Sequence, residues 1–140
     1  MMFWDSSAII PLCVDEPRSK EVRNIVKKDS SLVIWWGTPV ECFSAFARLR
    51  RENSLTGDDE NYLINIIHLL SDSWTEISPS RDVRDIAARL LRIHPLRDAD
   101  SLQLAASLIW AGRNPAGQSF VCFDKRLRDA AAKEGFTCLP

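Results

Sequence analysis

The sequence lacks both a long hydrophobic run and an excess of basic charge. None of its apolar stretches approaches the roughly 20 residues that a helix needs to cross a bilayer, so we expect no membrane-spanning segment. The 140 residues include 18 basic and 19 acidic side chains, which gives a formal net charge of −1. A protein that simply coats nucleic acid usually has a strongly basic footprint, and this chain has none. Balanced charge does not exclude a nucleic-acid partner, because acidic groups in a site can offset local basic patches.

Cysteine and histidine patterns typical of metal sites are also missing. The four cysteines form no CxxC pair, and the two histidines stand in no metal-spaced motif. Met1–Asp5 leads straight into an expected folded segment without a signal peptide, so we expect a cytoplasmic chain with free, reduced thiols. Neither Ser6 nor Ser7 has a histidine at a suggestive spacing, which argues against a serine nucleophile.

Short apolar runs alternate with helical patterns along the whole chain. The sequence contains no repeat, low-complexity tract or linker, so we expect a single domain over residues 1–140. Helices are expected over 6–14, 19–28, 38–53, from about 56, from 80, over 98–111 and over 126–134. Strands are expected over Met2–Trp4, Leu32–Trp36, Trp74–Ile77, Phe120–Phe123 and Phe136–Leu139. This alternation predicts an α/β fold with a mostly parallel sheet that helices cover on both faces.

Four carboxylates stand at junctions between strands and helices. Asp5 directly follows the first expected strand, and Asp124 directly follows Phe120–Phe123. Glu41 and Asp100 each lie one turn into a helix. Functional groups in open α/β sheets gather at the carboxyl ends of the strands, so these acids can converge. Converging carboxylates repel each other unless a cation is present, and Mg²⁺ and Mn²⁺ favour oxygen ligands.

Each acid also has a purely structural explanation. Asp5 and Asp124 can cap the helices that follow them, and Glu41 can complete a capping box opened by a threonine three residues earlier. Asp98 is expected to be the N-cap of its helix, which leaves Asp100 in a first turn that favours negative charge. Taken singly, each explanation is at least as good as a functional one. Four acids at four such junctions favour a shared site.

Basic side chains near these acids have two interpretations. Lys125, Arg126 and Arg128 follow Asp124 and can contact RNA phosphates, although solvation at the surface explains them nearly as well. The arginines of the segment 48–51 fit a solvated helix face better than a phosphate track.

Four segments of the chain resemble PIN-domain toxins of the VapC type. FWDSSAIIPLCVDEP resembles their opening strand, Asp-Ser-Ser and apolar helix, and TPVECFSAFARL resembles their glutamate-centred motif. LRDADSLQLAAS resembles the aspartate that opens a buried helix, and FVCFDKRLRDAAAKEGF resembles an apolar strand followed by Asp-x-x-Leu. The four segments stand in the expected order and cover essentially the whole chain.

This resemblance implies a three-layer α/β/α PIN-like fold and endoribonuclease activity that depends on Mg²⁺ or Mn²⁺. Its acidic quartet matches Asp5, Glu41, Asp100 and Asp124, of which we expect Asp5 and Asp100 to hold the metal. Ser6 matches a small polar residue that supports the first aspartate. Toxins of this type usually form homodimers, and a cognate antitoxin neutralises them by placing its tail in the active-site groove.

The chain departs from the family pattern at three positions. Asp98 adds a carboxylate beside Asp100, which leaves open which of the two binds metal. Asp100 is favoured because a small residue and a leucine follow it, as in the family. Gln103 stands where a histidine is frequent, and Cys122 stands where threonine or serine is frequent. None of these departures removes an acid of the motif.

The sequence therefore predicts metal-assisted hydrolysis of phosphodiester bonds in RNA by a toxin component. One alternative is a non-catalytic PIN module that binds RNA or a protein partner through the same groove. A receiver-like phosphoacceptor domain would need an acid pair at the first strand end, where Asp5 stands alone. A structure-selective DNA nuclease is chemically similar, but this short chain lacks obvious insertions for gripping a duplex.

Overall fold

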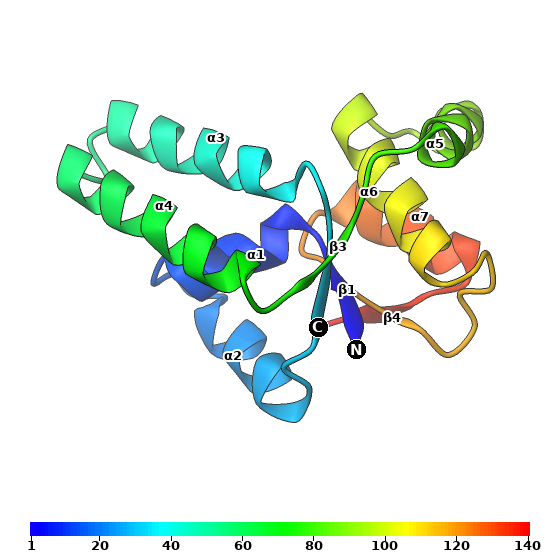
Figure 1. The fold of residues 1–140 in the computed structure, drawn as a ribbon, viewed down its shortest axis with the longest axis horizontal. Helices are drawn as coiled ribbons and strands as arrows, with labels where there is room; N and C mark the ends of the chain where they lie inside the picture. Colours follow the sequence, from blue (N-terminus) through cyan, green and yellow to red (C-terminus); the bar gives the residue numbers. More distant parts are fainter.

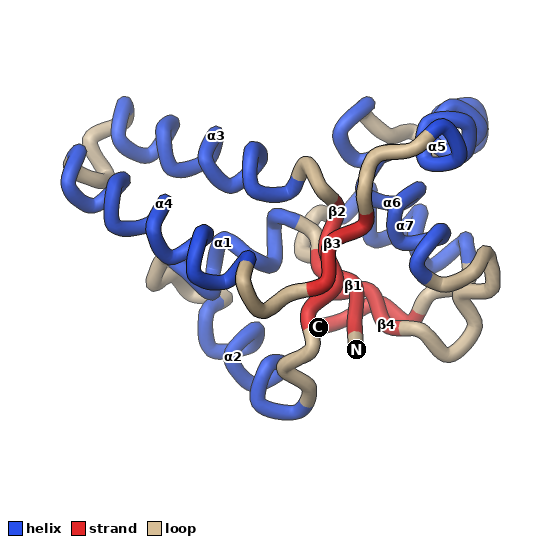
Figure 2. Tube along the Cα trace, viewed as in Figure 1, coloured by secondary structure: helices blue, strands red, loops and turns tan.

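A five-stranded parallel sheet forms the centre of the computed structural model, which describes residues 1–140 (Figure 2). Its strands follow the order β3-β2-β1-β4-β5, and every neighbouring pair is parallel. The carboxyl ends of all strands therefore lie at one edge of the sheet, as the sequence predicts. The strands are β1 (Met2–Trp4), β2 (Leu32–Trp35), β3 (Thr75–Ile77), β4 (Ser119–Val121) and β5 (Thr137–Leu139).

Helices cover both faces of the sheet, which confirms the expected three-layer α/β/α architecture (Figure 1). One face carries α1 (Ser6–Cys13), α2 (Ser19–Lys28), α3 (Thr38–Arg51) and α4 (Gly57–Ser71). The other face carries α5 (Arg81–Ile93), α6 (Asp98–Trp110) and α7 (Lys125–Glu134). None of these helices combines the length and hydropathy that crossing a bilayer requires.

Two hydrophobic cores, one on each face, hold the central strands in place. Successive side chains of a strand point to opposite faces, so Phe3 packs with α5, α6 and α7 while Trp4 packs with α1 to α4. Both side chains are fully buried, and the Phe3 ring stacks on Phe120 of β4 with 5.3 Å between centroids. The ends of β1 and β4 are therefore rigid supports for the residues that follow them.

Local signals in the sequence account for several helix boundaries. Thr56 and Asp59 form a capping box at the start of α4, and the Ser80 hydroxyl caps α5 by accepting a hydrogen bond from the Val83 amide at 3.2 Å. Gly135 ends α7 in the left-handed conformation, with a φ of 112°.

Several predicted element boundaries differ from those in the structure. Strand β4 ends at Val121, so Cys122 and Phe123 form a connection before Asp124. The N-cap of α3 is Gly37 instead of Thr38, whose buried hydroxyl accepts a hydrogen bond from α6.

The N-cap of α6 is Arg97, and Asp98 is the first helical residue. His94 lies in the connection that follows α5, where it is buried with its Nε2 3.4 Å from the Glu134 carboxylate.

Candidate active site

Asp5 is the most deeply buried of the four acids. Its backbone amide donates to Val121 O at 3.2 Å, which fixes the residue between the ends of β1 and β4. Its carboxylate accepts hydrogen bonds from the Ser7 hydroxyl at 2.6 Å and from the Cys122 thiol at 3.5 Å. Burial raises the pKa of Asp5 to about 7, and the nearby Glu41 carboxylate adds to this rise. Asp5 occupies the N-cap position of α1, but its two side-chain hydrogen bonds come from the Ser7 hydroxyl and the Cys122 thiol.

Glu41 is held from two sides by hydrogen bonds to other helices. Its Oε2 accepts from the Ser6 hydroxyl of α1 at 2.7 Å, and its Oε1 accepts from the Gln103 amide of α6 at 3.0 Å. The interpretation of Glu41 as a capping-box partner is therefore wrong, because both oxygens accept hydrogen bonds from other helices and no side chain caps the start of α3. Burial raises the pKa of Glu41, and Asp100 raises it further.

Asp100 and Asp124 face each other across the starts of α6 and α7. Asp100 is half-buried, and burial followed by repulsion from Asp124 raises its pKa. Asp124 is exposed and caps α7 by accepting a hydrogen bond from the Leu127 amide at 2.9 Å. This cap uses Oδ1 only, so Asp124 combines a structural role with a free carboxylate oxygen. Asp98 is exposed and makes the smallest of the contributions to the raised pKa of Asp100.

The two serines after Asp5 have distinct partners, and one expectation is corrected here. The resemblance assigned the support of Asp5 to Ser6, but it is the Ser7 hydroxyl that donates to Asp5, and Ser6 donates to Glu41. The Ser7 oxygen also accepts from the backbone amide of Phe123 at 2.9 Å, so it ties the start of α1 to the segment before Asp124.

Each of the four acids lies close enough to another for their charges to repel. Asp5 is coupled to Glu41, Glu41 to Asp100, and Asp100 to Asp124. None of them forms an ion pair with a lysine or arginine. The donor set consists of carboxylate oxygens without a positive partner, which fits a hard divalent cation. In the arrangement seen, no three acidic, histidine or cysteine side chains are close enough together to coordinate one ion.

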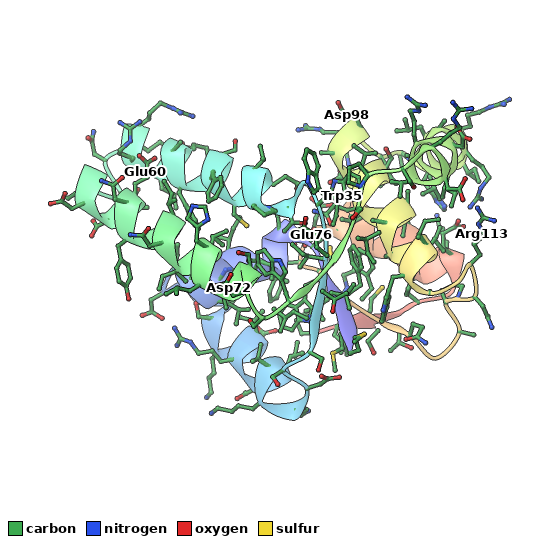
Figure 3. All side chains as sticks on the ribbon, viewed as in Figure 1. Trp35, Glu60, Asp72, Glu76, Asp98 and Arg113 are labelled. Carbon is green, nitrogen blue, oxygen red and sulfur yellow. The ribbon has the colours of Figure 1, made fainter.

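Two adjoining hollows surround the acids and share Asp124. One, of about 690 Å³, lies at the starts of α6 and α7. Figure 3 shows Asp98 at this end of α6. The other, of about 600 Å³, lies between α1 and α3. Glu41, Asp100 and Asp124 therefore line a groove with two arms, which we call the α6–α7 arm and the α1–α3 arm, whereas the buried Asp5 lines neither. The first is lined by Arg97, Asp98, Ala99, Asp100, Lys125 and Arg126, and the second includes Ser6, Ser7, Glu41 and Arg48.

The predicted basic residues divide between the groove and the rest of the surface. Lys125 and Arg126 are exposed and line the α6–α7 arm. Arg128 does not line the groove, because its guanidinium donates to the backbone carbonyls of Cys122 and Pro140. Arg48, which the sequence assigned to a solvated face, lines the α1–α3 arm and forms no ion pair. Its spacing of two helical turns from Glu41 is the signal that places both on one face of α3.

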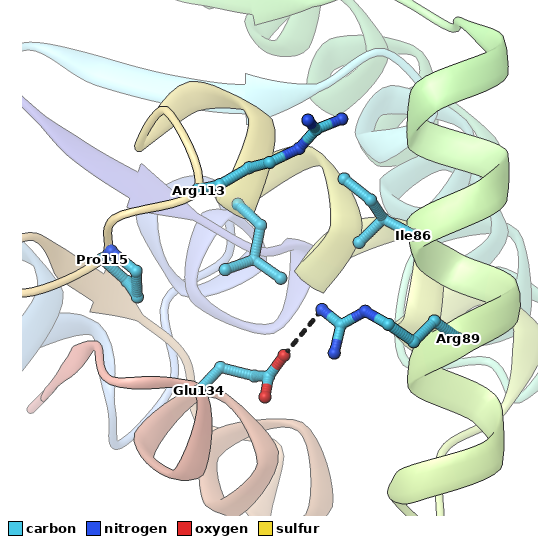
Figure 4. Close-up of a pocket in the computed structure, with 6 residues that line it drawn as sticks. Ile86, Arg89, Arg113, Pro115 and Glu134 are labelled. Carbon is cyan, nitrogen blue, oxygen red and sulfur yellow. Dashed lines mark hydrogen bonds and ion pairs between the residues drawn. The ribbon is translucent and has the colours of Figure 1, made fainter.

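A further hollow lies away from the acids, among α5, α6 and α7 (Figure 4). Its volume is about 200 Å³, and the Arg89–Glu134 ion pair of 3.1 Å crosses it. The lining contains a single carboxylate that is already paired, so this hollow does not resemble a metal site.

Searches against protein-family models and curated sequences find no significant match. Among solved structures, a toxin–antitoxin complex from Klebsiella pneumoniae has a TM-score of 0.68 at 13% identity, covering 98% of this chain and 97% of that chain. A VapC toxin from Mycobacterium tuberculosis that cleaves the sarcin-ricin loop has a TM-score of 0.68 at 15% identity, with the same coverage. The FitAB complex bound to a DNA fragment has a TM-score of 0.66 at 17% identity, covering 99% and 94%. The chain thus has the α/β PIN-like fold of VapC proteins over nearly its whole length.

Proposed function

We propose that this protein is a metal-dependent endoribonuclease that hydrolyses phosphodiester bonds in RNA. The observation that carries the proposal is the set of four acids at the carboxyl ends of the parallel strands, each repelled by at least one other and none in an ion pair. A buried carboxylate such as Asp5 is costly to ionise unless a cation neutralises it. One structural neighbour, a toxin that cleaves the sarcin-ricin loop, supports an RNA substrate.

Asp5 and Asp100 are the proposed ligands of Mg²⁺ or Mn²⁺, with Glu41 bound directly or through water. Asp124 completes the cluster or places a second ion. When bound, the cation activates a water nucleophile and stabilises the negative charge that develops on the phosphodiester. Asp100 is preferred to Asp98 because its carboxyl is half-buried and coupled to Asp124 and Glu41, whereas Asp98 is exposed.

The remaining residues of the site orient the acids and bind the substrate. The Ser7 hydroxyl holds Asp5, and the Ser6 hydroxyl holds one oxygen of Glu41. Lys125 and Arg126 line the α6–α7 arm and Arg48 lines the α1–α3 arm, and the two arms share Asp124. An RNA strand that follows the groove therefore contacts a positive side chain on each side of the bond to be cut.

The fold also supports a role in a toxin–antitoxin pair. One structural neighbour is a toxin–antitoxin complex, and a protein antitoxin is the partner that we propose for this chain. We further propose that the protein acts in the cytoplasm as a homodimer. These assignments rest on the neighbours and on the family resemblance of the four sequence segments.

RNA cleavage tests the proposed activity directly. Wild type and Asp5→Asn, purified identically, are incubated with a mixed-sequence RNA in the presence of Mg²⁺, Mn²⁺ or EDTA. We expect wild type to cleave only with a divalent cation and Asp5→Asn to cleave in none of the three conditions. Equal cleavage by both proteins would reveal a contaminating nuclease. RNA binding by wild type without any cleavage, together with no affinity for Mn²⁺, would favour a non-catalytic binding module.

Arg48→Ala is expected to weaken RNA binding without affecting the acids. Removing one phosphate contact should reduce the slope of log affinity against log salt concentration by about 1. The measurement is fluorescence anisotropy of a labelled RNA over a salt series, in an Asp100→Asn background that does not cut the probe. Lys27→Ala is the matched control, because Lys27 is exposed on α2 and forms no ion pair. Equal salt slopes for the two variants would show that the RNA does not follow the α1–α3 arm.

A further inference from the structure

Gln103 is a fully buried amide that connects the two helical layers at the active-site edge of the sheet. It belongs to α6, and its Nε2 donates to the Thr38 hydroxyl at 3.0 Å and to the Glu41 carboxylate at 3.0 Å, both on α3. An amide nitrogen carries two hydrogens, so both are used in reaching α3. The same helix carries Asp100, three residues before Gln103.

We propose that Gln103 is a positioning residue, whose amide fixes the Glu41 carboxylate relative to Asp100 and so sets the geometry of the metal site. The proposal rests on the function proposed above and extends it to a residue outside the acidic quartet. In the family pattern described for the sequence, this position was a departure without an assigned role.

Packing alone does not account for an amide at this position. Gln103 is fully buried on α6, where most of the buried residues that follow it are apolar. The Gln103 Oε1 atom is buried without a hydrogen-bond partner, and an unsatisfied buried acceptor carries a free-energy cost. The amide thus costs stability in the core, and its two donated hydrogen bonds both serve the part of α3 that carries Glu41.

The Glu41 carboxylate is held by two hydrogen bonds, and losing the one from Gln103 would leave it held by Ser6 alone. Ser6 holds Oε2 and Gln103 holds Oε1, so the carboxylate plane is fixed at two points. Without Gln103 the side chain retains a single anchor and can rotate about it. Metal sites require their ligands to be held within about 0.5 Å of the working geometry, and loss of a partner that orients a ligand typically costs about 10–100-fold in metal affinity or activity.

A double-mutant cycle on Mn²⁺ affinity tests this role. The four proteins are wild type, Gln103→Met, Glu41→Gln and the double variant, each titrated calorimetrically with Mn²⁺ alone. Methionine keeps the approximate length and volume of glutamine and removes the N–H donors. Gln118→Met is the control, because Gln118 is the other glutamine and lies before β4, at the opposite end of the strand from the acids.

We expect Gln103→Met to weaken Mn²⁺ binding about 10–100-fold, and to have no further effect once Glu41 is already replaced. Gln118→Met should bind Mn²⁺ as wild type does. Unchanged affinity in folded Gln103→Met, or a full loss that adds to that of Glu41→Gln, would overturn the proposal.

The urea unfolding midpoint of the same four proteins provides a second readout that needs no metal. If Gln103 and Glu41 interact as described, the shift of the midpoint in the double variant should differ from the sum of the single shifts. If wild type binds no Mn²⁺, that result counts against the proposed function but not against the Gln103–Glu41 contact. The unfolding midpoints then test that contact. Additive midpoint shifts would then show that Gln103 does not hold Glu41, and would overturn the proposal. If Gln103→Met does not fold, Gln103→Leu replaces it in the cycle.

Discussion

Asp100→Asn is expected to lower the rate of metal-dependent RNA cleavage by more than the roughly 10–100-fold typical of losing a residue that only orients a ligand. Asparagine is nearly isosteric with aspartate, so the half-buried start of α6 should retain its packing. The substitution removes the negative charge that is coupled to both Glu41 and Asp124. The measurement is the single-turnover cleavage rate of an RNA substrate at saturating Mn²⁺.

Asp98→Asn is the matched control, because Asp98 lies in the same helical turn and is exposed to solvent. We expect its cleavage rate to stay within a few-fold of wild type. A larger loss in Asp98→Asn than in Asp100→Asn would make Asp98 the ligand and would contradict the assignment drawn from burial and coupling.

Asp5→Asn is expected to increase the stability of the metal-free protein at pH 8 while abolishing its activity. Burial raises the pKa of Asp5 from its ordinary value of 3.8 to about 7 in the folded state. Between these two values the unfolded chain loses this proton while the folded chain keeps it, so stability falls as the pH rises from about 4 to 7. At about 1.4 kcal/mol for each pH unit, the loss amounts to roughly 4 kcal/mol at pH 8, and asparagine avoids it.

Urea unfolding in EDTA at pH 4 and at pH 8 checks this prediction. At pH 8 the variant should unfold at a higher urea concentration than wild type, and at pH 4 the two midpoints should nearly coincide. Saturating Mn²⁺ should raise the midpoint of wild type at pH 8, because the cation binds the ionised folded form. A variant that is less stable than wild type at pH 8 would show that the ionised carboxylate is already well stabilised without metal.

The order of elements and the four acids could be predicted from the sequence because their signals are local. The junction acids Asp5 and Asp124 stand beside short apolar runs, and the caps at Thr56 and Ser80 use hydrogen bonds that span three residues. The parallel sheet follows from the alternation of strands and helices, because parallel neighbours need a crossover between them.

The contacts that orient the acids could not be predicted, because they join distant parts of the chain. Gln103 is 62 residues from Glu41, and Cys122 is 117 residues from Asp5. Ser6 and Ser7 are adjacent and chemically identical, so only the direction of α1 decides which of them holds Asp5 and which holds Glu41.

The position of Arg48 in the α1–α3 arm could not be predicted from the sequence for a related reason. A basic side chain on a helix is equally compatible with solvent and with a groove until the neighbouring helix is placed. The structure places α1 against α3, which makes the face with Glu41 and Arg48 one wall of the α1–α3 arm.

Calorimetric titration of Mn²⁺ at pH 7.5 into wild type and Asp5→Asn tests the central claim, that the four acids form a divalent cation site. We predict saturable binding by wild type, accompanied by proton release because Asp5 is partly protonated in the metal-free protein. Asp5→Asn, although folded, should show little or no binding. Absence of saturable binding by wild type, or equal affinity in the two proteins, would contradict the claim.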